Sequence, residues 1–268
     1  GIECWGQLDW HMFDIPDGIF TEISLGNSIM CAINESGGIE CSCAVYGGNE
    51  DQRSVCWDQP NDTGYTQIAV GDKHACALDE SGCVKCWGVD HGYSSIGDYG
   101  QVTDAPQECI FTNIDAGYRH NCATKATGGI ECWGKWAEST NSPPESFDEI
   151  YTAISCSYYN TNCVINQLGN VECWGTQHNT WQQVTGAPNS SGWIVITGSE
   201  DYTSAINESG IIDGWGYGPY GASSGGPQPN VYFDVTGLGG ATTCALTCAE
   251  GLELDCAGEC GGDAVRDE

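Results

Sequence analysis

A pair of cysteines ten residues apart recurs along the chain, at Cys31/Cys41, Cys76/Cys86, Cys122/Cys132 and Cys163/Cys173. In the last three pairs the second cysteine opens a Cys-Trp-Gly tripeptide. The position of the first cysteine continues as Ser204 and Cys244, so successive units are 45, 46, 41, 41 and 40 residues apart. A period of about 40 to 50 residues with short strands and glycine-rich turns is typical of β-propeller blades. The chain is therefore an internal repeat.

Each unit has the pattern of several short strands. The full copies open with an aromatic-Thr-x-Ile strand, alternate apolar and polar residues through the first cysteine, and reverse at a Gly-containing turn into the second. Helix-period apolar runs are absent. We predict an all-β fold, a β-propeller of six blades. The full copies are Phe20–Cys41, Tyr65–Gly88, Phe111–Gly134 and Tyr151–Gly175, and weaker copies start at Trp193 and Phe233.

The two ends of the chain each hold part of a unit. Gly1–Gly6 reads as the second half of a unit, and Phe233–Leu246 reads as a first half. Joining them would leave no open sheet edge in the ring, so we predict closure by the N-terminal strand and a Cys4–Cys244 disulfide. In the alternative, Gly251–Cys256 completes the last blade locally. The predicted domains are a propeller over 1–246, with blades near 20–48, 65–88, 111–134, 151–175, 193–216 and 233–246 plus 1–6, and a Cys/Gly/Asp-rich tail over 247–268.

The unit pattern resembles that of a known family. Gly-x-x-His-x-Cys-Ala-Leu followed by Gly-x-Val-x-Cys-Trp-Gly is similar to the repeat of the regulator-of-chromosome-condensation (RCC1) family, over nearly all of residues 1–246. The resemblance implies a β-propeller, although members usually have seven blades and six units are present here. It implies no single function, because the family includes nucleotide exchange factors, enzyme inhibitors and surface modules.

Eighteen cysteines in periodic positions indicate disulfides and an oxidising compartment, extracellular or at the cell surface. In the unit that starts at Trp193 both positions are lost together, to Ser204 and Gly214, as expected if the two sulfurs form one bond. A zinc site at Cys83 and Cys86 is the alternative. Cys156, Cys248, Cys256 and Cys260 stay unassigned, and one of them could pair between chains. Besides Cys4–Cys244, the predicted pairs are Cys31–Cys41, Cys76–Cys86, Cys122–Cys132, Cys163–Cys173, Cys43–Cys56 and Cys83–Cys109.

The net charge of −30 argues against nucleic acid as a partner, because phosphate binding needs clustered cations. No apolar run approaches the ~20 residues that span a bilayer, so direct membrane insertion is not expected. We expect no cofactor and no metal. Acidic residues with glycine at Asn49–Asp51 and in the tail leave calcium as an alternative.

Two sets of residues are candidates for modification and contact. Asn-x-Ser/Thr sequons predict glycosylation at Asn34, Asn61, Asn189 and Asn207. Aromatic residues in the variable segments between units are typical of contacts with protein or sugar. Those predicted to interact are Trp10, Trp57, Trp136, Trp181, Tyr217 and Tyr220, and Tyr93 and Tyr99 lie in similar segments.

No catalytic motif accompanies this pattern. His74 and His120 share one repeat position, which favours a packing role over catalysis. We therefore expect no catalytic residues and no enzyme activity. The favoured function is an extracellular structural or interaction module, with a protein partner or self-association into the repeating subunit of a surface appendage or fibre. The alternatives are a soluble binding protein, such as a lectin or an enzyme inhibitor that uses a propeller face and binds glycans or protein, and a propeller enzyme acting on polysaccharide.

Overall fold

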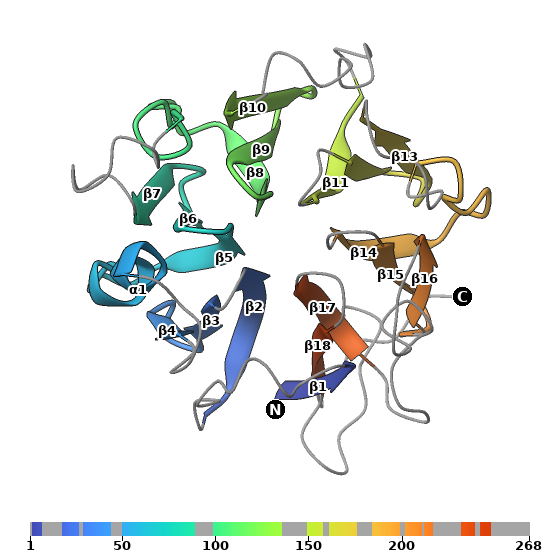
Figure 1. The fold of residues 1–268 in the computed structure, drawn as a ribbon. Coiled ribbons are helices and arrows are strands. Elements are labelled where there is room, and N and C mark those ends of the chain that lie inside the picture. The colour runs from blue at the N-terminus through green and yellow to red at the C-terminus, as the bar shows by residue number, and fades with distance from the viewer. Residues whose placement is uncertain are drawn as a thin grey trace.

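The fold is a β-propeller, in which three-stranded antiparallel sheets surround a central axis (Figure 1). The computed structural model describes residues 2–6, 18–26, 29–43, 50–88, 99–135, 149–157, 161–175, 184–198, 202–210, 212–216, 232–238 and 242–247. These residues form six sheets. In each sheet one strand lies nearest the axis, and the other two strands lie outside it. The inner strands are Phe20–Gly26, Tyr65–Val70, Phe111–Ala116, Tyr151–Cys156, Trp193–Gly198 and Tyr232–Leu238. The first four of these inner strands have the aromatic-Thr-x-Ile pattern.

Five sheets are each built from one continuous segment. The first holds β2 (Phe20–Gly26), β3 (Ile29–Asn34) and β4 (Ile39–Cys43). The second holds β5 (Tyr65–Val70), β6 (His74–Asp79) and β7 (Val84–Gly88). The third holds β8 (Phe111–Ala116), β9 (His120–Lys125) and β10 (Ile130–Gly134). The fourth holds β11 (Tyr151–Cys156), β12 (Asn162–Asn166) and β13 (Val171–Trp174). The fifth holds β14 (Trp193–Gly198), β15 (Tyr202–Asn207) and β16 (Ile212–Gly216).

The sixth sheet combines the two ends of the chain. The order is β1 (Ile2–Gly6), β18 (Thr242–Thr247) and β17 (Tyr232–Leu238). β1 is antiparallel to β18 with Cys4 opposite Cys244, and β17 contacts both β14 and β2. In the other sheets the first strand opens with an aromatic residue, and a bulge follows it directly. In the sixth sheet the bulge follows Tyr232, so the unit opens at Tyr232 and not at the predicted Phe233.

The aromatic-Thr-x-Ile pattern is explained by this bulge. The register shifts by one residue between the aromatic position and the second residue after it, as between Tyr65 and Gln67. The intervening threonine then turns its hydroxyl to the middle strand, where Thr66 Oγ1 donates to the Leu78 carbonyl at 3.2 Å. Thr21, Thr112 and Thr152 donate to the middle-strand carbonyls of their own sheets in the same way. A threonine hydroxyl thus supplies a donor where the bulge interrupts the ladder.

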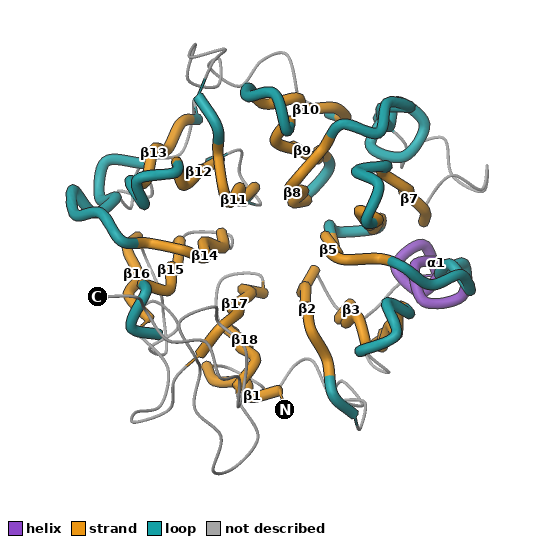
Figure 2. The backbone as a smooth tube through the Cα atoms, turned by 180° about the vertical axis from the view of Figure 1, so that it is seen from behind, coloured by secondary structure: helices purple, strands orange, loops and turns teal. Residues whose placement is uncertain are grey.

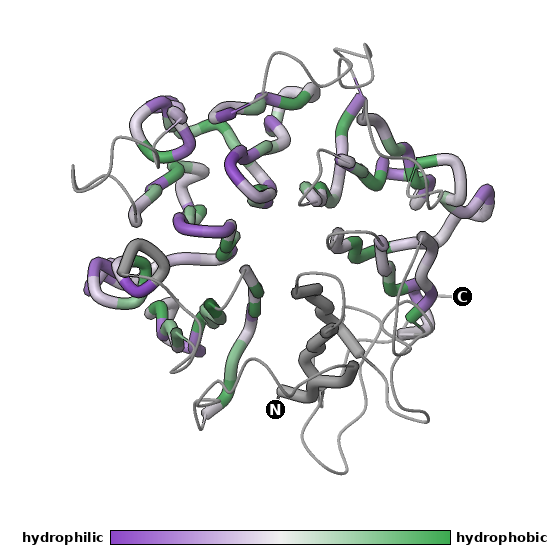
Figure 3. The backbone as a smooth tube through the Cα atoms, viewed as in Figure 1, coloured by the Kyte–Doolittle hydropathy of each residue, from purple (hydrophilic) through white to green (hydrophobic). Residues whose placement is uncertain are grey.

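The tryptophan of Cys-Trp-Gly packs between neighbouring sheets, as the repeat predicts. Trp87 belongs to a buried cluster with Ile29 and Ile33 of the preceding sheet, and Trp133 packs with Cys76 and Leu78. Hydrophobic residues of neighbouring sheets therefore pack together, and Figure 3 shows hydrophobic stretches along the strands. The apolar core is a series of such interfaces, and the first-cysteine position of one sheet lies against the tryptophan of the next.

One helix departs from the all-β prediction. α1 (Glu50–Trp57) lies in the insertion after β4, at the edge of the ring (Figure 2). The sequence gives little sign of it, because it is short and most of its residues are polar. Val55 is fully buried and its carbonyl accepts from Trp87 Nε1 at 2.9 Å, while Cys56 is bonded to Cys43. In the described part of the chain no helix is long and apolar enough to cross a membrane.

The molecule has two distinct faces. Because strands in a sheet are antiparallel, turns from first to second strands lie at one end of the sheets, and hairpin turns from second to third strands lie at the other. Neighbouring turns of the first kind meet, since Asp72 N donates to the Tyr118 carbonyl. The starts of first strands meet the hairpins, since Tyr65 N donates to Gly37 and Trp193 N to Gly169. We name these ends the turn face and the hairpin face.

Candidate functional site

The repeated histidines hold neighbouring sheets together. His74 Nε2 lies 2.9 Å from Asn121 Oδ1, and His120 Nε2 lies 3.0 Å from Asn162 Oδ1, so each ring donates to the next sheet. Both rings are buried. Burial lowers the pKa of His120, with the bond to Asn162 acting in the opposite direction. A neutral ring in a fixed hydrogen bond serves packing, which agrees with the structural interpretation of these residues.

The glycine of Gly-x-x-His is required by the ring. A Cβ at Gly117 would collide with Cε1 of His120, and one at Gly71 with Cε1 of His74. The fourth unit has Ser157 and Thr161 at these two positions, and the Ser157 hydroxyl accepts from Thr161 N instead. Asn121 and Asn162 were not identified from the sequence. The available signal is that, among the six units, asparagine precedes the first cysteine only in the two units that follow a histidine unit.

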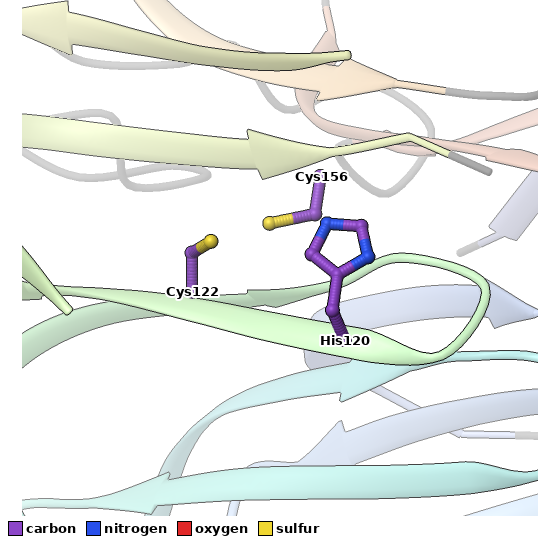
Figure 4. Close-up of side chains that lie close together, drawn as sticks. All are labelled: His120, Cys122 and Cys156. Atoms are coloured by element: carbon purple, nitrogen blue, oxygen red, sulfur yellow. The ribbon is translucent and has the colours of Figure 1, made fainter. Parts of the chain in front are cut away.

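A second cluster lies between β9 and β11, where His120, Cys122 and Cys156 converge (Figure 4). Their potential ligand atoms lie within 4.8 Å of one another and all three residues are buried. Cys122 is bonded to Cys132, however, so it offers no thiolate to a metal. Burial, and then the nearby Asp115 carboxyl, raise the pKa of the Cys156 thiol well above its usual range. The oxidised protein therefore has one inert thiol here, and the burial of Cys156 prevents an interchain bond unless the sheets separate.

A cavity of about 200 Å³ runs along the axis, lined by the first strands of five sheets. Polar side chains on its wall link neighbouring strands: Gln67 Oε1 accepts from Ile114 N at 3.0 Å, and Ser24 Oγ accepts from Val70 N at 3.0 Å. Asp115 Oδ2 accepts from Cys156 N at 2.7 Å, and burial raises the pKa of this carboxyl to about 7. The polar lining thus joins neighbouring sheets around the cavity.

Six disulfides are present in the described residues. They join Cys31–Cys41, Cys76–Cys86, Cys122–Cys132, Cys163–Cys173, Cys43–Cys56 and Cys83–Cys109. The four hairpin bonds link directly opposed residues whose Cα atoms are 4.0 Å apart. With Cys83 and Cys86 in different disulfides, the zinc alternative at this pair has no thiolate ligands.

The four sequons all belong to the hairpin face. Asn61 and Asn189 are exposed and precede β5 and β14, whose first residues bond to the hairpin of the preceding sheet. Asn34 and Asn207 begin hairpin turns and are half-buried. Asn34 Oδ1 accepts from Ser36 N and Gly38 N, which fixes the turn. An asparagine at this position therefore has a structural reason to be there, separate from glycosylation.

The predicted contact residues mostly fall on parts of the chain that the structure leaves undescribed. Trp57 is 71% exposed at the end of α1. Trp10, Trp136, Trp181, Tyr217 and Tyr220, together with Tyr93, lie outside the described residues. So do Asn49, the tail considered for calcium, and Cys248, Cys256 and Cys260. Tyr99 is described, and it belongs to a cluster that the sequence did not indicate.

Tyr99 and Tyr118 hold Arg119 on the turn face. The guanidinium carbon lies 5.0 Å from the Tyr99 ring centroid and 4.6 Å from that of Tyr118. Its Nη1 donates to Tyr99 Oη at 3.2 Å and its Nη2 to Tyr118 Oη at 3.3 Å. Lys135 Nζ lies 4.4 Å from the Tyr99 ring, and Lys135 N donates to the Arg119 carbonyl. We call Tyr99, Tyr118, Arg119 and Lys135 the Arg119 cluster.

This cluster differs from Lys85 and Lys125, which are each paired with a carboxylate. Lys85 forms an ion pair with Asp62 at 3.1 Å, and Lys125 forms one with Glu131 at 2.6 Å. Arg119, by contrast, is fixed by aromatic rings and hydroxyl groups, and no described carboxylate contacts it. Stacking and hydrogen bonding pre-organise the guanidinium for an acidic group.

Comparison with known proteins agrees with this architecture. Residues 65–101 match the family described as Regulator of chromosome condensation (RCC1) repeat. The chain is an RCC1-like β-propeller. No curated protein is significantly similar to it in sequence. The match includes β5, β6 and β7, and therefore the Gly-x-x-His and Cys-Trp-Gly motifs of the second sheet.

Solved structures show the same fold. The RCC1-like propeller superposes on Prp20p from Saccharomyces cerevisiae with a TM-score of 0.58 and 14% identity, covering 86% of this chain and 69% of that one. For the ectodomain of the Arabidopsis thaliana receptor kinase ACR4 the TM-score is 0.53 at 22% identity, covering 74% and 65%. For the ectodomain of the Physcomitrella patens receptor kinase CR4 it is 0.57 at 18%, covering 84% and 60%. The chain thus spans less than two thirds of each receptor ectodomain.

Proposed function

We propose that this RCC1-like propeller is an extracellular protein-interaction module that acts as the repeating subunit of a surface assembly. The observation that carries the proposal is the disulfide in each of the first four hairpins, with two further disulfides tying the segments between sheets to them. Such bonds persist in oxidising compartments and stabilise the blades that carry them without a large core. A locally stapled repeat suits a load-bearing or docking role.

The similar proteins support an interaction role in general. Two of them are receptor ectodomains, and Prp20p is described with its binding properties to Gsp1p and histones. An enzyme acting on polysaccharide would need two carboxyl groups facing a substrate cleft. Glu149 and Glu172 are close enough to interact electrostatically. They lie on the hairpin face and do not line the axial cavity. An interaction module is therefore favoured over an enzyme.

The second candidate is a soluble lectin or inhibitor, for which the axial cavity is a candidate binding site. At about 200 Å³ the cavity holds only a small group, and its polar residues already bond to neighbouring strands. A ligand there would have to displace these bonds, which makes this function the weaker of the two.

The test is the association state of protein purified under non-reducing conditions. We expect mass photometry at moderate salt to find reversible assemblies larger than the 28.5 kDa chain, and disulfide mapping to find no free hairpin cysteines. Strict monomers that bind a sugar or protein saturably would instead support the soluble binding protein. Turnover of a polysaccharide by the purified chain would contradict the proposal.

A further inference from the structure

The Arg119 cluster places a positive charge on the turn face of an otherwise acidic molecule. Seven lysines and arginines oppose 37 acidic residues in the chain. Lys73 lies in the neighbouring turn of the second sheet, and Arg119 and Lys135 lie in the third, so three of the seven cations gather on one sector of one face. The Arg119 side chain is half-exposed and retains donors beyond the two that bond to tyrosines. This geometry suits a carboxylate from outside the chain.

The hairpin face carries an acidic pair in the adjoining sector. Glu149 meets the hairpin of the third sheet, since Gly129 N donates to its carbonyl, and Glu149 Oε1 accepts from Asn166 Nδ2 at 2.8 Å. Glu172 follows the hairpin of the fourth sheet, and no described cation contacts it. Burial, and then the charge of Glu149, raise the pKa of Glu172. Two like charges held close together are stabilised by a cation placed between them.

The sequons border this sector. Asn34 and Asn207 begin the hairpins of the first and fifth sheets. The hairpins of the second, third and fourth sheets contain no sequon. Asn189, however, precedes β14, whose Trp193 N donates to Gly169 in the hairpin of the fourth sheet, so a glycan there would flank the acidic pair on the side of the fifth sheet.

We propose that Arg119 of one copy binds Glu149 and Glu172 of a second copy, so that the turn face of one propeller stacks on the hairpin face of the next. This inference rests on the proposed function, because it names the contact by which the subunits assemble. The partner is a second copy because the chain itself supplies both halves of the contact. In such a head-to-tail assembly the first and last copies each keep one unused face, so further copies can add and the assembly extends as a filament. The net charge of −30 opposes association at low salt, while salt screens this repulsion beyond about 8 Å and spares the close contact.

Two variants that each remove one half of the contact test the proposal. Arg119→Glu destroys the cationic half, and Glu149→Lys/Glu172→Lys destroys the acidic half. We expect sedimentation velocity of each variant alone, in non-reducing buffer at about 0.3 M salt, to show at least about a tenfold loss of association. An equimolar mixture should regain association, because the intact Arg119 of one variant meets the intact acidic pair of the other, and the two altered halves also carry opposite charges.

The chain offers a matched control. Lys85→Glu makes the same change in net charge as Arg119→Glu, but Lys85 already pairs with Asp62. It should assemble like the unaltered protein, and the milder Arg119→Gln should still lose association if Arg119→Glu fails to fold. Assembly of Arg119→Gln at the unaltered level, or a mixture that stays monomeric, overturns the contact while assembly itself and the proposed function stand. An unaltered protein that remains monomeric at every salt concentration overturns both.

Discussion

Asp115 illustrates how one wall residue of the axial cavity makes stability depend on pH. Burial raises its pKa from 3.8 to about 7, so between these values the folded protein holds a proton that the unfolded chain has released. The contribution of Asp115 to the free energy of unfolding is therefore present near pH 4 and is lost as the pH rises toward 7. Asp115→Asn removes the ionisable group and keeps an oxygen for Cys156 N. The variant should gain stability relative to the unaltered protein as pH rises from 5 to 8, measured by denaturant unfolding. An unchanging difference between the two proteins would contradict the shifted pKa.

His120 makes stability depend on pH in the opposite direction to Asp115, and its contact with Gly117 can be tested by substitution. Its pKa is lowered from 6.5, so below pH 6.5 the unfolded chain binds a proton that the folded ring does not, and stability falls as pH decreases. Gly117→Ala should destabilise the protein because its Cβ would collide with the His120 ring and with the Ser157 carbonyl oxygen. Adding His120→Ala should recover part of that loss, giving a coupling of about 0.5–3 kcal/mol in a double-mutant cycle. Strictly additive losses would show that the glycine serves another purpose.

At the level of single residues, sequence reasoning identified the repeat position of His74 and His120 but not what they contact. The partners Asn121 and Asn162 lie some 45 residues away in the next unit. The Arg119 cluster was missed for a related reason: Tyr99 comes from a variable segment, and only folding brings it to the turn of the third sheet. Contacts between units follow from the curvature of the ring, which one unit's sequence does not encode.

The hairpin is the element that the disulfide stabilises. Cys76 and Cys86 face each other across β6 and β7, just as Ser204 and Gly214 do in the fifth sheet, where no disulfide is possible. Cys76→Ser/Cys86→Gly copies that natural hairpin. The loop closed by the bond is short, so chain entropy predicts a loss of about 2–3 kcal/mol in the free energy of unfolding. Guanidinium unfolding under non-reducing conditions measures it, and a loss of the whole fold would instead mean that the disulfide is needed to form the blade.

The segments between sheets depend on the tryptophan and glycine of Cys-Trp-Gly. Trp133 Nε1 donates to the Gln101 carbonyl, as Trp87 Nε1 does to the Val55 carbonyl, so these two indoles fix the segments that precede the third and second sheets in the chain. Gly134 has a φ of 95°, and a Cβ at this position would lie 2.7 Å from the Arg119 carbonyl oxygen. The tripeptide could be assigned to a strand from the sequence alone. Helix α1 could not, because a short polar helix held by Val55 and one disulfide has no periodic apolar face.

For the whole molecule, the remaining question is how the ring is closed. The antiparallel pairing of β1 with β18 places Cys4 opposite Cys244, in the same relation as the four bonded hairpin pairs, and β17 contacts its neighbours on both sides. These observations favour closure by the N-terminal strand over completion of the last blade by Gly251–Cys256. Six blades, and the Cys4–Cys244 bond itself, remain predictions.

The closing bond should stabilise the ring more than any hairpin bond, since it links the two ends of a loop that holds nearly the whole propeller. Entropy of loop closure grows with the logarithm of loop length, which gives about 5 kcal/mol here against about 2–3 for a hairpin. Cys4→Ser/Cys244→Ser should therefore lose roughly twice as much unfolding free energy as Cys76→Ser/Cys86→Gly in the same non-reducing titration. The ring would then open first between β1 and β18, and limited proteolysis should cut near the N-terminus before the other sheets. If peptide mapping joins Cys256 to Cys244 and the Cys4→Ser protein is as stable as the unaltered one, the sixth blade is completed by the C-terminal segment, and β1 only covers its edge.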